Sequence, residues 1–181
     1  MANGETPLIG VKLVIYKKIV PGDFRKFRAE SNDTPSGGGA RDLRFRPATE
    51  FNTQFNRMFS VPGVDGSLTG QFYWDGLSPT NVTIHQPTNS RPGEVRIATV
   101  HECFPPQVVP NDCEDCVLLL ILRSDERVYP VFTSERSLRE DNWHPDVKGP
   151  ILRGLHADRS ANKTPMGYVD IENRREWHNG R

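Results

Sequence analysis

The chain has 181 residues, of which 23 are basic, 23 are acidic and about a third are apolar. This length fits one domain with a sizeable core, and the neutral balance excludes a strongly basic surface over the whole molecule. The longest apolar run, Val117–Leu122, is much shorter than the roughly 20 residues that cross a bilayer, and Met1–Gly10 lacks the pattern of a signal peptide. We therefore expect a cytoplasmic protein without membrane contacts.

The sequence pattern predicts many short strands, because Gly and Pro residues are spread throughout and apolar residues alternate with polar ones in the segments between them. Polar Ser31–Ala40 is predicted as a loop. The expected strands are, in chain order, Gly10–Val20, Leu43–Phe45, Leu68–Trp74, Val82–His85, Val95–Val100, Val117–Arg123 and Val128–Thr133. Of these, Val117–Arg123 is apolar throughout and should be buried on both faces.

Two short helices are predicted between the strands. In Thr49–Phe59, the residues Phe51, Phe55 and Met58 recur at helical spacing, so they should face the core, with Thr49 as N-cap. Ser134–Asn142 is the second helix, capped by Ser134. The predicted fold class is therefore mainly β with two short helices, a barrel-like domain over residues 10–158 followed by a polar C-terminal arm over 159–181.

The three cysteines, Cys103, Cys113 and Cys116, are too few for a disulfide scaffold, so we expect reduced thiols. Together with His101 they could hold tetrahedral zinc, which stays an alternative to purely structural thiols. The order His101-Glu102-Cys103 resembles a zinc deaminase signature, but the spacing between its residues does not match.

No catalytic residue is predicted. The sequence lacks a Gly-x-Ser-x-Gly elbow and a phosphate-binding Gly-x-x-x-x-Gly-Lys loop. A metal-dependent nuclease needs carboxylates and a lysine on adjoining strands. Pro145-Asp146 could start such a motif, but no Asp/Glu-x-Lys follows it at strand spacing, because the chain turns at Gly149-Pro150, and Asp125-Glu126 has no lysine near it. No cofactor or metal is therefore expected.

Two loops carry side chains suited to nucleic acid. Ser31–Gly39 combines hydroxyl, amide and glycine residues that fit phosphates and base edges, and it leads directly to Arg41, Arg44 and Arg46. Thr88–Arg96 combines Arg, Asn and Glu, which pair with guanine, adenine and cytosine respectively. An ordinary solvated loop is the alternative for each of them.

The charge distribution favours a localised binding face. The segment Lys12–Arg57 holds ten basic and five acidic residues, although the whole chain is neutral. The predicted DNA-contacting residues are Lys17, Lys18, Ser31, Asn32, Asp33, Thr34, Ser36, Gly37, Arg41, Arg44, Arg46, Asn89, Ser90, Arg91, Glu94 and Arg96.

The order of these motifs resembles the N-terminal effector domain of EcoRII-type restriction endonucleases. The resemblance covers roughly residues 12–135 and rests on Tyr16-Lys17-Lys18, Ser31-Asn32-Asp33-Thr34 with its glycines, Leu43–Arg46, Met58-Phe59, Asn89-Ser90-Arg91 and Glu94-Val95-Arg96-Ile97. The strand Val117–Leu122 and its partner near Val131–Thr133 also follow in order. The second loop is shorter than the family's pattern and contains Pro92, so no base preference is carried over.

The resemblance implies a DNA-binding pseudobarrel that clasps double-stranded DNA with two arms from the major groove. Ser31–Gly39 would form the first arm, and Arg91, Glu94 and Arg96 would belong to the second. The domain would target a restriction endonuclease whose nuclease domain or subunit lies elsewhere. A metal-dependent nuclease with an unrecognised carboxylate site and a β-rich protein-interaction module are the alternatives.

Overall fold

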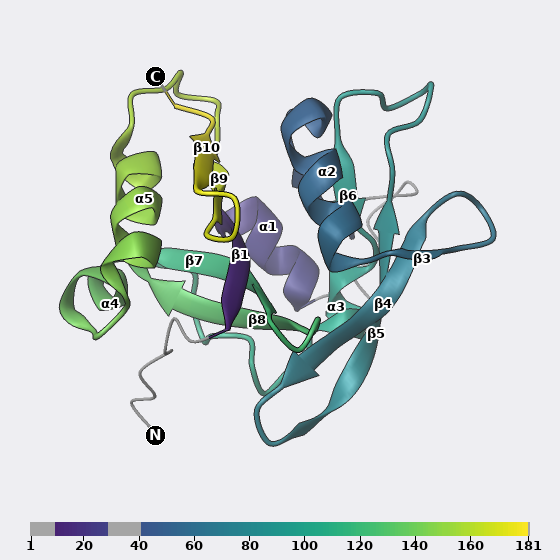
Figure 1. Cartoon of the computed structure of the whole chain (residues 1–181), viewed down its shortest axis with the longest axis horizontal. Coiled ribbons are helices and arrows are strands. Elements are labelled where there is room, and N and C mark those ends of the chain that lie inside the picture. Colours follow the sequence, from purple (N-terminus) through teal and green to yellow (C-terminus); the bar gives the residue numbers. More distant parts are fainter. Residues whose placement is uncertain (1–9, 29–40, 181) are drawn as a thin grey trace. The chain divides into compact units, whose positions relative to one another are not determined.

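The computed structural model describes residues 10–28 and 41–180 (Figure 1). The chain divides into two compact units, whereas the sequence predicts one main domain. Unit 1 comprises Met1–Val20 and Cys113–Arg181, and unit 2 comprises Pro21–Asp112. Strands make up 36% of the described residues and helices 25%, which confirms the mainly β class. The predicted loop Ser31–Ala40 lies outside the described residues.

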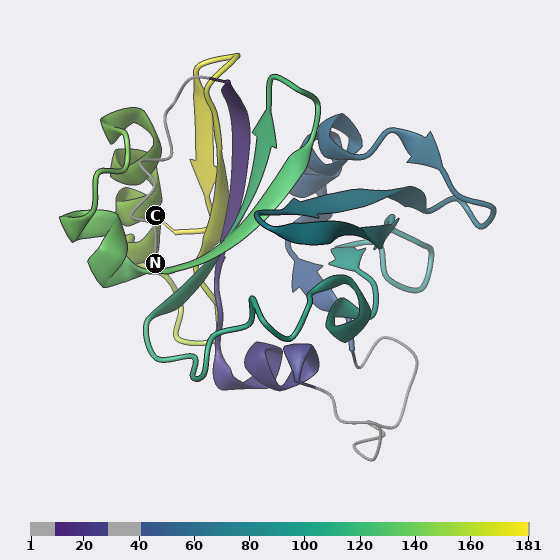
Figure 2. The same cartoon turned by 90° about the horizontal axis from the view of Figure 1, so that it is seen from below.

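Unit 1 is an antiparallel sheet with two helices beside it, and its strands run in the order β10-β9-β1-β7-β8. Figure 2 shows the yellow strands β9 and β10 next to the purple strand β1. The elements of unit 1 are β1 (Val11–Lys18), β7 (Cys116–Arg123), β8 (Val128–Ser134), α4 (Glu135–Glu140), α5 (Pro145–His156), β9 (Met166–Asp170) and β10 (Arg175–His178).

The two helices of unit 1 cover one face of its sheet. Alternation along β1 and β7 turns Val14, Tyr16 and Leu119 toward apolar side chains of α4 and α5. The helix residues in this cluster are Leu138, Val147, Ile151 and Leu155. Strand β7 is buried along its length up to Leu122, as its continuous apolar sequence predicts.

The C-terminal segment is part of this sheet and does not form the polar arm predicted for residues 159–181. Strand β9 pairs with β1 from Leu13↔Asp170 to Lys17↔Met166, and all five of its residues are buried. The apolar run Met166–Val169 is short and lies between polar segments, so the average polarity of the region concealed a strand.

Unit 2 is a second antiparallel arrangement, with strands in the order β4-β5-β6-β2 and with β3 paired to β4. Figure 1 shows α2 beside β6. The elements of unit 2 are α1 (Pro21–Phe27), β2 (Leu43–Phe45), α2 (Ala48–Met58), β3 (Val61–Pro62), β4 (Leu68–Trp74), β5 (Leu77–His85), β6 (Val95–Ile97) and α3 (Val100–Cys103).

A chain of aromatic rings forms the core of unit 2. Phe45 on β2 contacts Phe51 and Phe55 of α2, with ring centroids 5.4 and 5.1 Å apart. Phe72 on β4 contacts Phe104 at 5.2 Å. Most of these pairs meet edge to face, the geometry that the ring quadrupole favours. The predicted aromatic stripe of α2 is therefore confirmed as core.

The described residues contain five helices, whereas the sequence predicts two, and one predicted N-cap is wrong. Ser134 does cap α4, because its hydroxyl accepts a hydrogen bond from the Ser137 N–H at 2.9 Å. Thr49 is not the cap of α2, which begins at Ala48 after Pro47. Helices α1, α3 and α5 were not predicted. Helices α1 and α5 begin with proline, which fits the first turn of a helix. The strand predicted over Val95–Val100 ends at Ile97, and α3 begins at Val100.

Helix α5 approaches β1 closely at Gly154. A Cβ atom at this position would overlap the hydroxyl of Tyr16 and approach Cβ of His178. We expect Gly154→Ala to destabilise the protein by about 1–3 kcal/mol through overpacking. Gly149→Ala in the same helix is the control, since its nearest neighbour would be Arg153 Nη1 at 3.5 Å. Chemical denaturation measures both; equal stability of the two variants would contradict this packing.

Candidate nucleic-acid interface

The pairing of β2 with β6 gathers charged residues on one face of unit 2. The register is Leu43↔Ile97, Arg44↔Arg96 and Phe45↔Val95. The apolar members are fully buried, so alternation places both arginines on the opposite face. Arg46 follows β2 and Glu94 precedes β6, so the same alternation adds them to this face.

A single buried carboxylate lies among these arginines. The side chain of Glu94 is only 4% exposed. Arg46 donates to Glu94 Oε2 from Nη2 at 2.5 Å and from Nε at 3.0 Å. The other oxygen, Oε1, lies 3.9 Å from Nε of Arg44 and 3.7 Å from both Nη1 of Arg91 and Nε of Arg96. We call Arg44, Arg46, Arg91, Glu94 and Arg96 the Glu94 cluster.

A second buried carboxylate, Asp42, forms an ion pair with Arg96, the least exposed arginine of the cluster. Nη1 of Arg96 donates to Asp42 Oδ2 at 2.7 Å, and the backbone N–H of Thr99 donates to Oδ1 at 3.2 Å. Like charges directly opposite each other destabilise a sheet. Arg44 and Arg96 form such a pair across β2 and β6. Asp42 and Glu94 flank this pair and offset the repulsion.

The arginines differ in accessibility. The exposed fraction of the side chain is 62% for Arg46, 40% for Arg44 and 36% for Arg91, but only 12% for Arg96. Three guanidinium groups can therefore meet a ligand from solvent. Arg96 and Glu94 were predicted as DNA-contacting residues, and the structure places them below this surface.

The second predicted arm contains a tight turn. Arg91 N–H donates to the Thr88 carbonyl at 2.9 Å, and the Thr88 N–H donates back to Arg91 at 3.3 Å. Asn89 and Ser90 form the exposed tip. The carbonyl of Gly93 accepts from the Ala48 N–H at 3.1 Å, which joins the end of this segment to the start of α2. The turn is thus closed by its own backbone hydrogen bonds and joined to α2 at one end, with Asn89 and Ser90 exposed.

The remaining predicted residues fall into three groups: Arg41 in unit 2, two lysines of β1 in unit 1, and those outside the described residues. Nη1 of Arg41 is 3.3 Å from His101 Nε2. Lys17 and Lys18 belong to β1 in unit 1, and Lys17 is 4% exposed. Ser31, Asn32, Asp33, Thr34, Ser36 and Gly37 lie outside the described residues. Asp42 was missed, although the alternation Asp42-Leu43-Arg44-Phe45 places it on the face of Arg44.

The thiols show no metal-binding geometry. Within residues 10–28 and 41–180, no three His, Cys, Asp or Glu side chains are grouped so that they could hold a metal ion. All three cysteines are thiols, not disulfides. Cys103 Sγ donates to the Val100 carbonyl at 3.6 Å, and burial raises the pKa of this thiol to about 12.

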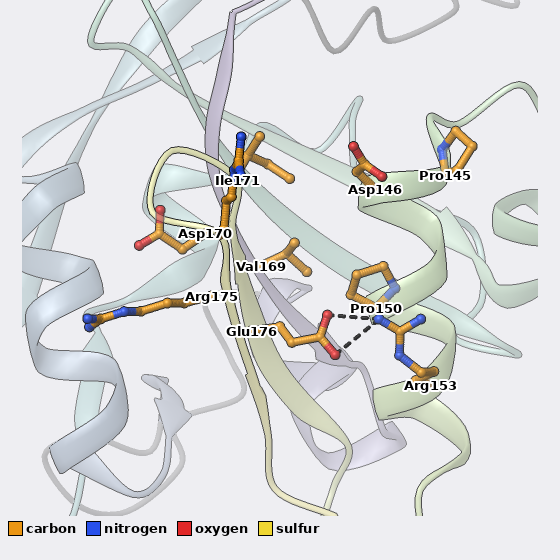
Figure 3. A pocket seen from close by; sticks show the side chains of 10 residues that line it. Pro145, Asp146, Pro150, Arg153, Val169, Asp170, Ile171, Arg175 and Glu176 are labelled. Carbon is orange, nitrogen blue, oxygen red and sulfur yellow. Dashed lines mark hydrogen bonds and ion pairs between the residues drawn. The ribbon is translucent and has the colours of Figure 1, made fainter.

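Unit 1 contains a pocket of about 750 Å³ between α5 and the β9–β10 turn (Figure 3). Arg153 of α5 faces Glu176 of β10 across it, and the two form an ion pair at 2.8 Å. Its lining includes three arginines and three acidic residues. These charges balance and indicate no particular ligand, so the Glu94 cluster is the better candidate site.

Comparisons of the chain with protein-family models, with curated proteins and with solved structures gave no match. In the described part of the chain, no helix combines the length and apolar character required to cross a membrane. The Glu94 cluster, with its exposed arginines around one buried carboxylate, is therefore the candidate functional site.

We expect Asp42→Asn to destabilise the protein by about 1.5–3 kcal/mol, because it removes the charged acceptor of a largely buried arginine. Asp75→Asn in the exposed β4–β5 turn is the control and should change stability by less than about 0.5 kcal/mol. The measurement is the free energy of unfolding in urea. A loss no larger than that of the control would show that Arg96 does not need Asp42.

Cys103 should resist alkylation in the folded protein. Only the thiolate attacks iodoacetamide, and at pH 8 a thiol with a pKa of about 12 remains protonated. Cys113 is partly exposed and should react first. Peptide mapping by mass spectrometry measures the labelling of each cysteine over time. In denaturant, Cys103 and Cys113 should be labelled at similar rates. Equal labelling of both residues under native conditions would contradict the burial of Cys103.

Proposed function

We propose that this chain binds double-stranded DNA through unit 2, with the Glu94 cluster at the centre of the contact surface. The observation that carries the proposal is the convergence of Arg44, Arg46 and Arg91, all partly exposed, on one buried carboxylate. Glu94 accepts two hydrogen bonds from Arg46 and forms ion pairs with Arg44 and Arg91, while part of each arginine side chain faces solvent. Arginine held in this way suits the paired acceptors of a phosphate or of a guanine edge.

Local charge supports this proposal although unit 2 as a whole is close to neutral. Residues 21–112 contain nine basic and ten acidic residues. Five of the nine basic residues fall within 41–46 and 91–96, where the only acidic residues are Asp42 and Glu94. The two short segments therefore carry a surplus of three positive charges. A concentrated surplus of this kind favours contact with a few phosphates over binding along a long stretch of DNA.

The polar turn beside the cluster could contribute to sequence preference. Asn89 and Ser90 are exposed at its tip, next to Arg91. An asparagine amide can pair with adenine, and a serine hydroxyl can contact any base edge or phosphate. We therefore place base reading at this tip and at the exposed arginines.

The resemblance to the effector domain of EcoRII-type endonucleases extends the proposal. On this interpretation the chain is the targeting module of a cytoplasmic restriction system, and its strands form the DNA-binding pseudobarrel of that family. DNA cleavage would then depend on a nuclease domain or subunit outside this chain. The motif order along residues 12–135 and the mainly β fold are the support for this interpretation.

We expect duplex binding with a slope on the order of −3 to −5 in log affinity against log salt concentration, since each phosphate contact contributes about −0.9. Arg46→Gln should reduce this slope by about one and weaken binding to all sequences, roughly three- to tenfold at 0.1 M salt. The measurement is a fluorescence titration of specific and random duplexes over a range of salt.

The matched control is Arg136→Gln in α4 of unit 1. Arg136 is 79% exposed and pairs with Glu140 at 2.9 Å, so it resembles Arg46 in charge and accessibility but lies in another unit. Its affinity and slope should equal those of the unchanged protein. Equal losses in both variants would point to non-specific electrostatic binding, and the absence of duplex binding by the folded protein at low salt would reject the proposed function.

A further inference from the structure

We infer that Glu94 is a positioning residue that sets the direction of the exposed arginines and limits their affinity for random DNA. This inference rests on the proposed function and deepens it. It also assigns Glu94 a different task from the base contact predicted from the sequence. Three observations carry it: the burial of the carboxylate, the arrangement of guanidinium groups around both of its oxygens, and its position directly before β6.

Burial makes Glu94 poorly placed to form a hydrogen bond with a DNA base. Its side chain is 4% exposed, whereas that of Arg46 next to it is 62% exposed. To accept a hydrogen bond from a cytosine amino group, the carboxylate would have to reach a groove of the DNA. The arginines extend further into solvent than Glu94 does, so they would meet the DNA first.

Both carboxylate oxygens already face guanidinium groups. Oε2 accepts two hydrogen bonds from Arg46, at 2.5 and 3.0 Å. Oε1 lies within 3.9 Å of nitrogens from Arg44, Arg91 and Arg96, which come from β2, the turn and β6. One side chain therefore connects the three segments that present the arginines.

This arrangement has two consequences for binding. An arginine fixed before binding loses less side-chain entropy when it meets its ligand, so a fixed direction improves discrimination between sequences. The negative charge of Glu94 also reduces the local positive surplus, which weakens attraction to any phosphate. Together, these effects would raise the preference for one sequence over random DNA.

The test begins with Glu94→Gln in the DNA-free protein. We expect the ¹⁵Nε–¹H NMR signal of Arg46, sharp in the unchanged protein because Nε donates to Glu94, to broaden or move to the position of a solvated arginine. The Nε signal of Arg136 is the internal control. An unchanged Arg46 signal in a folded variant would overturn the positioning role without any reference to DNA.

DNA titrations then separate positioning from base reading. With Glu94→Gln we expect random duplex to bind roughly five- to tenfold more tightly at 0.1 M salt, with a slope steeper by about one, because one more arginine becomes available to phosphate. Preference for the selected sequence should fall across several base pairs. A loss confined to a single cytosine-containing pair, with unchanged random binding, would mean that Glu94 reads that base and would overturn the inference.

Arg46→Lys keeps the test decisive if Glu94→Gln does not fold. A lysine retains the charge but lacks the planar group that donates twice to one carboxylate. We expect the salt slope to stay the same while sequence preference falls at least fivefold. Retention of full preference would contradict the inference. If the unchanged protein binds no duplex at all, the proposed function fails, whereas the NMR measurement still decides the role of Glu94.

Discussion

The charged face of unit 2 depends on the ion pairs that the buried carboxylates of Asp42 and Glu94 form with arginines. The pairing of β2 with β6 sets Arg44 opposite Arg96, and two guanidinium groups in that position repel each other. Asp42 and Glu94 lie on either side of the pair and hold it through contacts of 2.7 to 3.9 Å. Glu94 also contacts Arg46 and Arg91, so one carboxylate both supports the paired strands and meets the arginines of the proposed binding face.

The hydrophobic interior explains why the charged residues lie on only one face of the paired strands β2 and β6. Leu43, Phe45, Val95 and Ile97 are fully buried, and the rings of α2 pack against Phe45. Alternation then leaves the intervening positions to polar residues, and here these positions hold arginines and carboxylates. The aromatic core and the proposed binding face are thus the two sides of the same short strands.

Local patterns allowed much of the fold to be predicted. Alternation located β2, β4 and β8 closely, a continuous apolar run located β7, and helical spacing of phenylalanines located α2. Helices α1 and α5 were missed because proline and glycine normally interrupt helices, and β9 was missed because its apolar run is brief. The division into two units depends on contacts between distant segments, such as β1 with β9, which local patterns do not encode. For the site, residue type identified Arg44, Arg46 and Arg91, but burial of Glu94 follows from packing and could not be predicted from its sequence position.

The central claim is that this chain recognises duplex DNA, and selection from a randomised pool tests it most directly. The full chain would be incubated with random duplexes, with and without modified cytosine, and the retained molecules sequenced over several rounds at increasing salt. The account predicts enrichment of one short sequence and retention that weakens steadily as salt rises. A folded protein that retains no duplex at low salt, or that retains all sequences equally, would contradict it.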